Sequence, residues 1–129
     1  MISFENGVFS LGTENFTYMF RLTAHGQLEQ LHFGATVQMA DAQAFACKPG
    51  TGWGSSVNYD ADGTCLDILP LEWSGSGRGD YRESPLELAG QSTDLRYVNY
   101  EILEGVAPIS CGLPQAHGDC ETLVITMEQ

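Results

Sequence analysis

The chain has 129 residues, of which 43% are apolar, enough for one compact domain with a core but too few for two. Five Lys and Arg stand against seventeen Asp and Glu, which gives a formal net charge of -12 at pH 7. Because an acidic surface repels phosphate backbones and anionic lipids, we expect neither a nucleic-acid nor a membrane partner. The acidic residues are scattered along the chain, which is typical of a solvated surface. This charge does not exclude a neutral ligand such as a sugar.

The amino-terminal segment MISFENGVFSLGTENF has no basic leader followed by a long apolar run. No window approaches the ~18 apolar residues that a membrane span requires. We therefore expect a cytoplasmic location.

The first predicted hairpin covers residues 16–33. Apolar side chains alternate with other residues in its first strand, so one face carries Phe16, Tyr18, Phe20 and Leu22 and the other Thr17, Met19 and Arg21. This pattern predicts a half-buried strand. Ala24-His25-Gly26 supplies a turn, and Leu28, Leu31 and Phe33 return on the partner strand.

Residues 46–63, ACKPGTGWGSSVNYDADG, form a long polar stretch of the kind that is usually functional or disordered. Its end matches positions 1, 3, 5 and 6 of a calcium-binding loop at Asn58, Asp60, Asp62 and Gly63. The twelfth position is Leu69 where a bidentate acid is needed, so an acidic turn is favoured over calcium.

The two tryptophans have different surroundings. Trp53 is flanked by glycines in the long stretch, where its indole could stack on the apolar face of a sugar or pack locally. Trp73 follows DILPLE, and structural packing is its favoured role.

Short charge patterns follow. Asp80 and Arg82 are two residues apart, as are Asp94 and Arg96, which predicts local ion pairs in extended segments. The tripeptide Arg78-Gly79-Asp80 is also found in adhesion proteins, but adhesion requires export and the chain shows no signal sequence.

Two further strands are expected near the end of the chain. In LRYVNYEILEG, Val98, Tyr100 and Ile102 share a face and Gly105 ends the run, while prolines limit the following APISCGLP to an edge strand or a loop. The terminal ETLVITMEQ alternates as a strand, with Leu123, Ile125 and Met127 on one face. Since no turn or cap follows this strand, we expect a truncated part of a larger domain.

Few side chains suggest chemistry by themselves. Four cysteines show neither a CxxC pair nor a histidine at metal-ligand spacing, and we expect free, mostly buried thiols: Cys47, Cys65, Cys111 and Cys120. The histidines have no nucleophile or orienting acid nearby, which indicates turn or surface positions for His25, His32 and His117. No metal site and no cofactor are expected. The elements together predict an all-β antiparallel sandwich with little helix.

Several segments, taken in order, resemble the amino-terminal region of bacterial α-galactosidases of glycoside hydrolase family 36, from about Phe16 to the end. They are YMFRLTAHGQLEQLHFG, CLDILPLEWSGSGRGDYRESPLEL, STDLRYVNYEI and CGLP. The matching motifs are Phe33-Gly34, the run Leu66, Asp67, Leu69 and Pro70, then Gly79-Asp80-Tyr81-Arg82, Asp94 to Tyr97, and Gly112-Leu113-Pro114. The chain departs from the family at Leu71-Glu72-Trp73-Ser74, where a glutamine and an aromatic-proline pair are common, which suggests a subgroup with a different loop.

The resemblance implies that residues 1–129 are a single domain or the truncated amino-terminal part of a β-supersandwich. The parent would hydrolyse terminal α-galactosides such as melibiose and raffinose with retention of configuration. Two aspartates of a following (β/α)8 barrel would perform the chemistry, so we expect the catalytic residues beyond residue 129 and an inactive fragment.

The family resemblance also implies a homo-oligomer, expected to be a tetramer, in which amino-terminal loops reach the active-site rim of a neighbouring subunit. The candidate for this role is the loop from Gly52 to Asp62. The predicted contacts with α-galactoside oligosaccharides are Trp53 for sugar stacking, Tyr59 and Asp60 for hydroxyl groups, and Arg78 and Asp80 at the border of the same surface. The alternative is a freestanding carbohydrate-binding β-sandwich without hydrolase activity.

Overall fold

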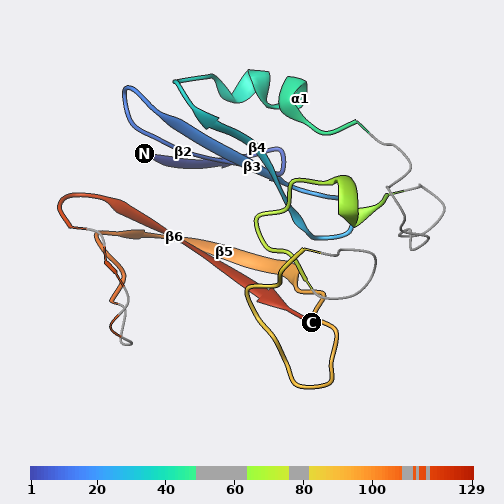
Figure 1. The fold of residues 1–129 in the computed structure, drawn as a ribbon. Coiled ribbons are helices and arrows are strands. Elements are labelled where there is room, and N and C mark those ends of the chain that lie inside the picture. Colours follow the sequence, from blue (N-terminus) through green and yellow to red (C-terminus); the bar gives the residue numbers. More distant parts are fainter. Residues whose placement is uncertain (49–63, 76–81, 109–111, 113, 116) are drawn as a thin grey trace.

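The computed structural model describes residues 1–48, 64–75, 82–108, 112, 114–115 and 117–129 (Figure 1). Within this part of the chain there are six strands: β1 (Ile2–Glu5), β2 (Val8–Gly12), β3 (Thr17–Leu22), β4 (Leu28–Gly34), β5 (Arg96–Glu104) and β6 (Glu121–Glu128). The helical elements are α1 (Ala42–Phe45) and the 3-10 turns Met39–Asp41 and Leu66–Ile68. None of these helices is long and apolar enough to cross a membrane.

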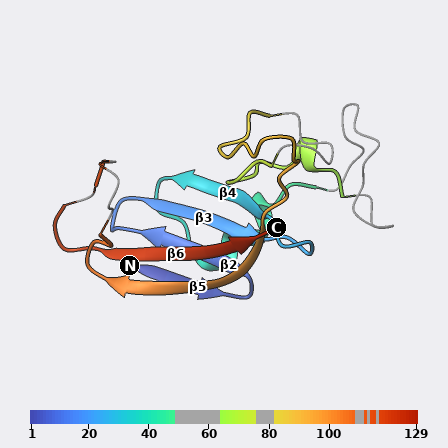
Figure 2. The ribbon, with the colours of Figure 1, turned by 90° about the horizontal axis from the view of Figure 1, so that it is seen from below.

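The strands form two layers. β1 to β4 make an antiparallel meander in chain order, and β5 and β6 form a hairpin that lies against one face of it (Figures 1 and 2). This arrangement confirms the predicted antiparallel β-sandwich with little helix.

The turn between β1 and β2 is closed by Asn6 and Gly7, with φ angles of 50° and 80°. Two successive residues of positive φ are what a two-residue hairpin requires, because this turn matches the right-handed twist of the strands. Glu5 pairs with Val8 directly across it.

The predicted hairpin of residues 16–33 is confirmed as β3 and β4, joined by a turn in which Gly26 has a φ of +87°. The half-buried character of β3 is wrong, however, because Thr17 and Met19 are buried along with Phe20. The segment after β4, with α1, covers the second face of the sheet (Figure 1), and Val37 donates a backbone hydrogen bond to Thr17 Oγ1.

The main core lies between the two layers. Its buried members are Phe9, Phe20 and Leu28. The predicted inward face of the terminal strand is confirmed, since Leu123, Ile125 and Met127 of β6 pack against this core.

The prediction for the other strand of this hairpin is partly wrong. A bulge between Tyr97 and Asn99 turns Tyr97 and Tyr100 toward the core and leaves Val98 44% exposed. Val98 therefore does not share the buried face of Tyr100. The partner of β5 is β6, and the proline-containing segment belongs to the connection between them.

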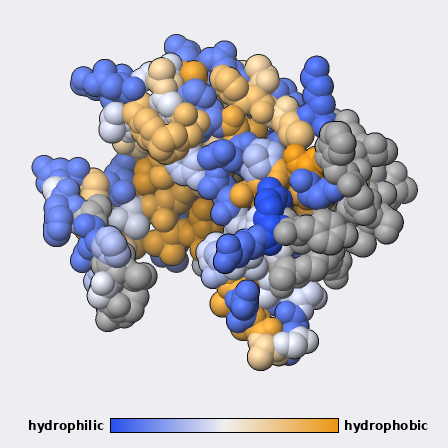
Figure 3. All heavy atoms as spheres, in the orientation of Figure 1, coloured by the Kyte–Doolittle hydropathy of each residue, from blue (hydrophilic) through white to orange (hydrophobic). Residues whose placement is uncertain are grey.

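Apolar atoms are exposed between the two layers in the space-filling view (Figure 3). One groove of about 320 Å³ there is lined by Leu28, Glu72, Trp73, Leu95, Ile125 and Met127. The buried indole Nε1 of Trp73 has no hydrogen-bond partner in this part of the structure. The predicted structural role of Trp73 agrees with its place in this groove.

Candidate functional site

All five predicted sugar-contact residues lie outside the described residues: Trp53, Tyr59, Asp60, Arg78 and Asp80. The same is true of the calcium-loop positions Asn58, Asp62 and Gly63. The structure does describe the residues that flank these segments. We call Cys47, Lys48, Thr64 and Cys65 the stem of segment 49–63, and Gly75 and Arg82 the stem of segment 76–81.

A cavity of about 280 Å³ lies between the β3–β4 turn and the chain that leaves segment 49–63. Three of its lining residues, Cys47, Thr64 and Cys65, belong to the stem of that segment. The other lining residues are Arg21, Leu22, Thr23, Ala24, His25, Glu29, Ile68 and Leu69. Both ends of the long segment therefore open from one corner of the meander.

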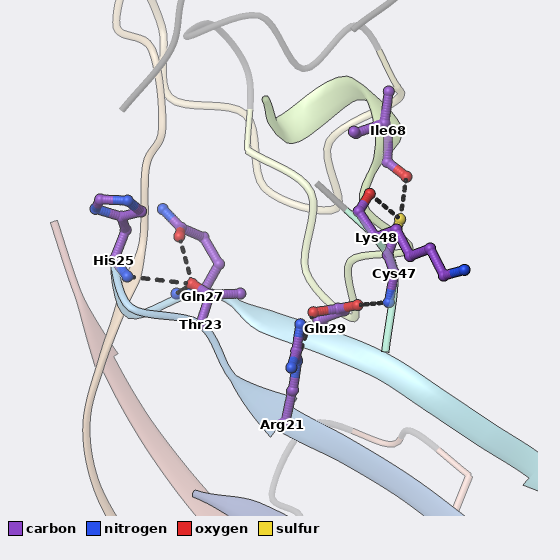
Figure 4. Close-up of polar contacts among 8 residues, drawn as sticks. All are labelled: Arg21, Thr23, His25, Gln27, Glu29, Cys47, Lys48 and Ile68. Atoms are coloured by element: carbon purple, nitrogen blue, oxygen red, sulfur yellow. Dashed lines mark hydrogen bonds and ion pairs between the residues drawn. The ribbon is translucent and has the colours of Figure 1, made fainter. Parts of the chain in front are cut away.

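Glu29 is the centre of the polar contacts at this corner (Figure 4). Its side chain is 0% exposed, and its Oε2 accepts a hydrogen bond from Arg21 Nε at 2.7 Å. Its Oε1 accepts the backbone N–H of Cys47, also at 2.7 Å. Because each oxygen has a donor, the buried charge is compensated, and β4 is joined to the start of the stem.

Cys47 extends this link to the 3-10 turn. Its free thiol lies 3.7 Å from the carbonyl oxygen of Ile68 and 3.6 Å from that of Lys48. The Cys47 side chain also packs against Leu66 and Leu69. Both sides of the long segment are thus in contact through this residue.

Arg82, which follows segment 76–81, also binds the Leu66–Ile68 turn. Its guanidinium donates to the carbonyl oxygens of Leu69 at 2.5 Å and of Leu66 at 2.8 Å. At the opposite side of segment 76–81, a Cβ on Gly75 would overlap the backbone oxygen of Thr93. The arginine of the glycine-aspartate-tyrosine-arginine motif therefore has a structural contact that the sequence did not reveal.

The chain between the two stems runs beside β4. Gln30 donates its backbone N–H to Pro70 at 2.7 Å, and Glu72 donates to Leu28 at 2.9 Å. The Glu72 carboxylate also acts on the Tyr18 hydroxyl, both as a hydrogen-bond acceptor and through its charge. Burial, with that hydrogen bond and the negative charge of Glu72, raises the pKa of Tyr18 well above its ordinary value.

A second network joins the cavity to β5. Thr23 Oγ1 donates to Gln27 Oε1 at 2.8 Å, and Gln27 Nε2 lies 3.5 Å from Asp94 Oδ1. The predicted pair of Asp94 and Arg96 is confirmed at 3.1 Å, whereas Asp80, the proposed partner of Arg82, is outside the described residues. The Gln27–Asp94 contact therefore connects the lining of the cavity to the residues just before β5.

The predictions for cysteine and histidine are partly confirmed. None of Cys47, Cys65 and Cys120 is in a disulfide, but only Cys65 is buried, while Cys47 is partly buried and Cys120 exposed; Cys111 is outside the described residues. His25 lies in the β3–β4 turn and His117 is exposed, whereas the partly buried His32 packs on the ring of Phe45. Within the described ranges, no three His, Cys, Asp or Glu side chains gather as a metal site requires.

Comparison with known proteins identifies the family to which the chain belongs. A sequence profile described as the glycosyl hydrolase family 36 N-terminal domain matches residues 26–129. The chain is 26% identical to the α-galactosidase Mel36A of Lactobacillus acidophilus over 96% of its own length and 18% of that protein. It is 30% identical to the bifunctional α-galactosidase/sucrose kinase AgaSK of Mediterraneibacter gnavus over 93% of its length and 14% of that protein.

Solved structures agree with these matches. The galactosidase domain of AgaSK superposes with a TM-score of 0.82 at 27% identity, covering 100% of this chain and 19% of that one. An α-galactosidase AgaA variant from Geobacillus stearothermophilus, crystallised with raffinose, gives a TM-score of 0.76 at 26% identity over 93% of this chain and 18% of that chain. The chain thus spans less than a fifth of these relatives, and it belongs to the glycosyl hydrolase family 36 N-terminal domain family.

Proposed function

We propose that residues 1–129 are the amino-terminal part of the β-supersandwich of a retaining, cytoplasmic α-galactosidase. Its substrates would be terminal α-galactosides such as melibiose and raffinose. The catalytic carboxylates would belong to a barrel domain outside these residues, so the 129-residue chain alone would be inactive. The relatives named as α-galactosidases, one of them crystallised with raffinose, support this proposal.

We further propose that segments 49–63 and 76–81 contribute to the rim of an active site in a homo-oligomer, expected to be a tetramer. One observation carries this proposal: one residue from each stem contacts the Leu66–Ile68 turn or the residue after it, Cys47 at the carbonyl of Ile68 and Arg82 at the carbonyls of Leu66 and Leu69. Segments that leave the fold from one corner can act on one ligand.

The test is Trp53→Ala in the full-length enzyme that carries this domain. Loss of a stacking indole should raise KM for raffinose several-fold and leave kcat nearly unchanged, because the contact is remote from the reacting bond. An aryl α-galactoside, which has no distal sugar, serves as the control substrate and should be hardly affected. An unchanged KM for raffinose would contradict the assignment of the rim.

The alternative proposal is a freestanding carbohydrate-binding β-sandwich. The cavity beside the stems, with its polar and apolar lining, is the feature that favours it. Isothermal titration of the 129-residue chain with galactose and raffinose separates the two proposals. Saturable heat with the chain alone would support a binding module, whereas no heat would support a domain that needs its enzyme.

A further inference from the structure

We propose that the open edge of β6, with the apolar groove beside it, receives an extended strand from the remainder of the α-galactosidase chain. This inference rests on the proposed function, since that function places residues 1–129 in a longer enzyme. The inference goes further by naming the surface at which the two parts meet. The added strand would widen the second layer beneath β4 and bury every second side chain in the groove.

The second layer of the sandwich is narrower than the meander, with two strands in the described chain against four. β5 lies on the side of β1, where Tyr100 contacts Phe4. β6 lies nearer to β4, since Ile125 and Met127 share the groove with Leu28. In Figure 2, β3 and β4 extend past β6 on the side away from β5. A further strand next to β6 would therefore lie against a part of the meander that the second layer leaves uncovered.

The edge of β6 that points away from β5 offers backbone groups for pairing. Within the described ranges β5 is the one strand that pairs with β6, and the extra residue of their bulge belongs to β5. Edge strands in stable proteins are usually protected by lysine, proline or a bulge. β6, with the sequence ETLVITME, has none of these. Such an edge is a template for a further strand.

The groove beside this edge is apolar and only partly filled. Its volume is about 320 Å³, and five of its six described lining residues are apolar, Glu72 being the exception. Farther along the same face of the meander, Phe33 is 69% exposed beside the ring of Tyr18. Figure 3 shows apolar atoms at the surface between the two layers. Apolar surface gathered in this way is typical of a contact with another protein segment.

Two polar atoms in the wall of the groove lack partners. Glu72 Oε1 and Trp73 Nε1 are buried, and neither has a hydrogen bond in the described chain. Because buried polar atoms in complete folds are nearly always bonded, this acceptor and this donor indicate that a neighbour is missing here. The backbone of an added strand carries both N–H and C=O groups, so it brings both kinds of partner to this wall.

The remainder of the enzyme is the occupant that these observations favour. The chain spans less than a fifth of its α-galactosidase relatives, so most of such an enzyme lies outside residues 1–129. A second copy of the chain fits less well. Antiparallel pairing of two β6 strands would bring both meanders to one side of the joint sheet, where the parts that extend past β6 would overlap.

Photo-methionine tests the proposal without a mutation, because its diazirine side chain is close to methionine in size. It replaces methionine in cells that make the full-length enzyme, and light then joins each labelled side chain to its neighbours. Met127 lines the groove, whereas Met19 is 0% exposed in the meander and serves as the internal control. Mass spectrometry identifies the peptides joined to each.

We expect Met127 to be joined to a segment of the same chain outside residues 1–129, with apolar residues at alternate positions. Met19 should be joined only to peptides within these residues. Enzyme assembled from isotopically heavy and light subunits distinguishes a segment of the same chain from one of another subunit. Products of Met127 that are confined to residues 1–129, or that involve another subunit, would overturn the proposal.

Hydrogen exchange read at single residues supplies a second measurement. The β6 amides that do not bond to β5 should exchange at least about ten-fold more slowly in the full-length enzyme than in the 129-residue chain, because the added strand gives them partners. The β6 amides that bond to β5 are the control and should be protected in both proteins. Equal exchange of the edge amides would contradict the added strand.

Hydrolysis of an aryl α-galactoside by the same preparation separates this inference from the proposed function. An active enzyme whose Met127 products stay within residues 1–129 would remove the added strand and keep the function. A product beyond these residues in a protein without α-galactosidase activity would keep the added strand and remove the function.

Discussion

Replacement of Phe9 by alanine tests where the core of this sandwich lies. Phe9 is 0% exposed, and its ring centroid lies 4.3 Å from Phe4, 5.0 Å from Phe20 and 5.2 Å from Tyr100. Tyr100 belongs to β5, so this one ring joins the meander to the second layer. Truncation of a buried phenylalanine leaves a cavity that the neighbouring rings cannot fill.

Such a truncation costs about 3–5 kcal/mol. Since a domain of this size has a total stability of about 5–15 kcal/mol, Phe9→Ala should remove a large fraction of the free energy of unfolding. The matched control is Phe33→Ala, because Phe33 is 69% exposed and lies at the surface beside the rings of Phe16 and Tyr18. Its loss should cost about 1 kcal/mol or less.

Urea unfolding followed by tryptophan fluorescence and circular dichroism measures both variants. The midpoint should fall strongly for Phe9→Ala with little change in slope, since the slope reports the surface exposed on unfolding. Equal costs for the two variants would refute the assignment of Phe9 to the centre of the core. A cost below about 1 kcal/mol for Phe9→Ala would have the same meaning.

Three other predictions concern the stems and Tyr18. Gly75→Ala should cost about 2 kcal/mol or more in urea unfolding, because the new Cβ would overlap the Thr93 backbone oxygen, and a cost below about 1 kcal/mol would contradict that overlap. The Tyr18 pKa is raised in the folded protein, so the stability that this hydroxyl contributes is fully present below pH ~10 and is lost as the pH rises further. The difference in urea midpoint between the parent and Tyr18→Phe should therefore shrink from pH 8 to pH 11, and a constant difference would contradict the cause given for the shift. Arg82→Met should destabilise the chain by about 1–3 kcal/mol in thermal unfolding, since the Leu69 carbonyl loses the guanidinium as its donor and the Leu66 carbonyl keeps only the Leu69 N–H; no loss would contradict a stabilising role for these bonds.

Much of the sandwich could be predicted because apolar and polar residues alternate along most of its strands. The turn between β3 and β4 also contains a glycine, Gly26, which marks it in the sequence. The Asn6-Gly7 turn carried an equally clear signal, since this dipeptide between apolar runs is the strongest short-range mark of a hairpin, yet β1 and β2 were not predicted. The face of Val98 could not be predicted, because a bulge shifts one residue out of the alternation without leaving a mark in the sequence. The burial of Met19 could not be predicted either, because the face of β3 that carries it is covered by the segment after β4, which shows no periodic pattern in the sequence.

The site shows a similar division. Counting back from the predicted β3–β4 turn places Arg21 opposite Glu29, so this pair could have been found from the sequence. The bonds from Glu29 to Cys47 and from Arg82 to the Leu66–Ile68 turn join parts of the chain that no local pattern connects. They depend on tertiary packing, which a single sequence does not express.

The two layers also differ in how far apart their contacts are along the chain. β1 to β4 are consecutive and joined by short turns, so the meander requires only small loop closures. The second layer is tied to it by contacts such as that between Gln27 and Asp94, which are 67 positions apart. We expect the meander to form early in folding and to serve as the surface on which β5 and β6 assemble, because long closures are slow until a partner surface exists.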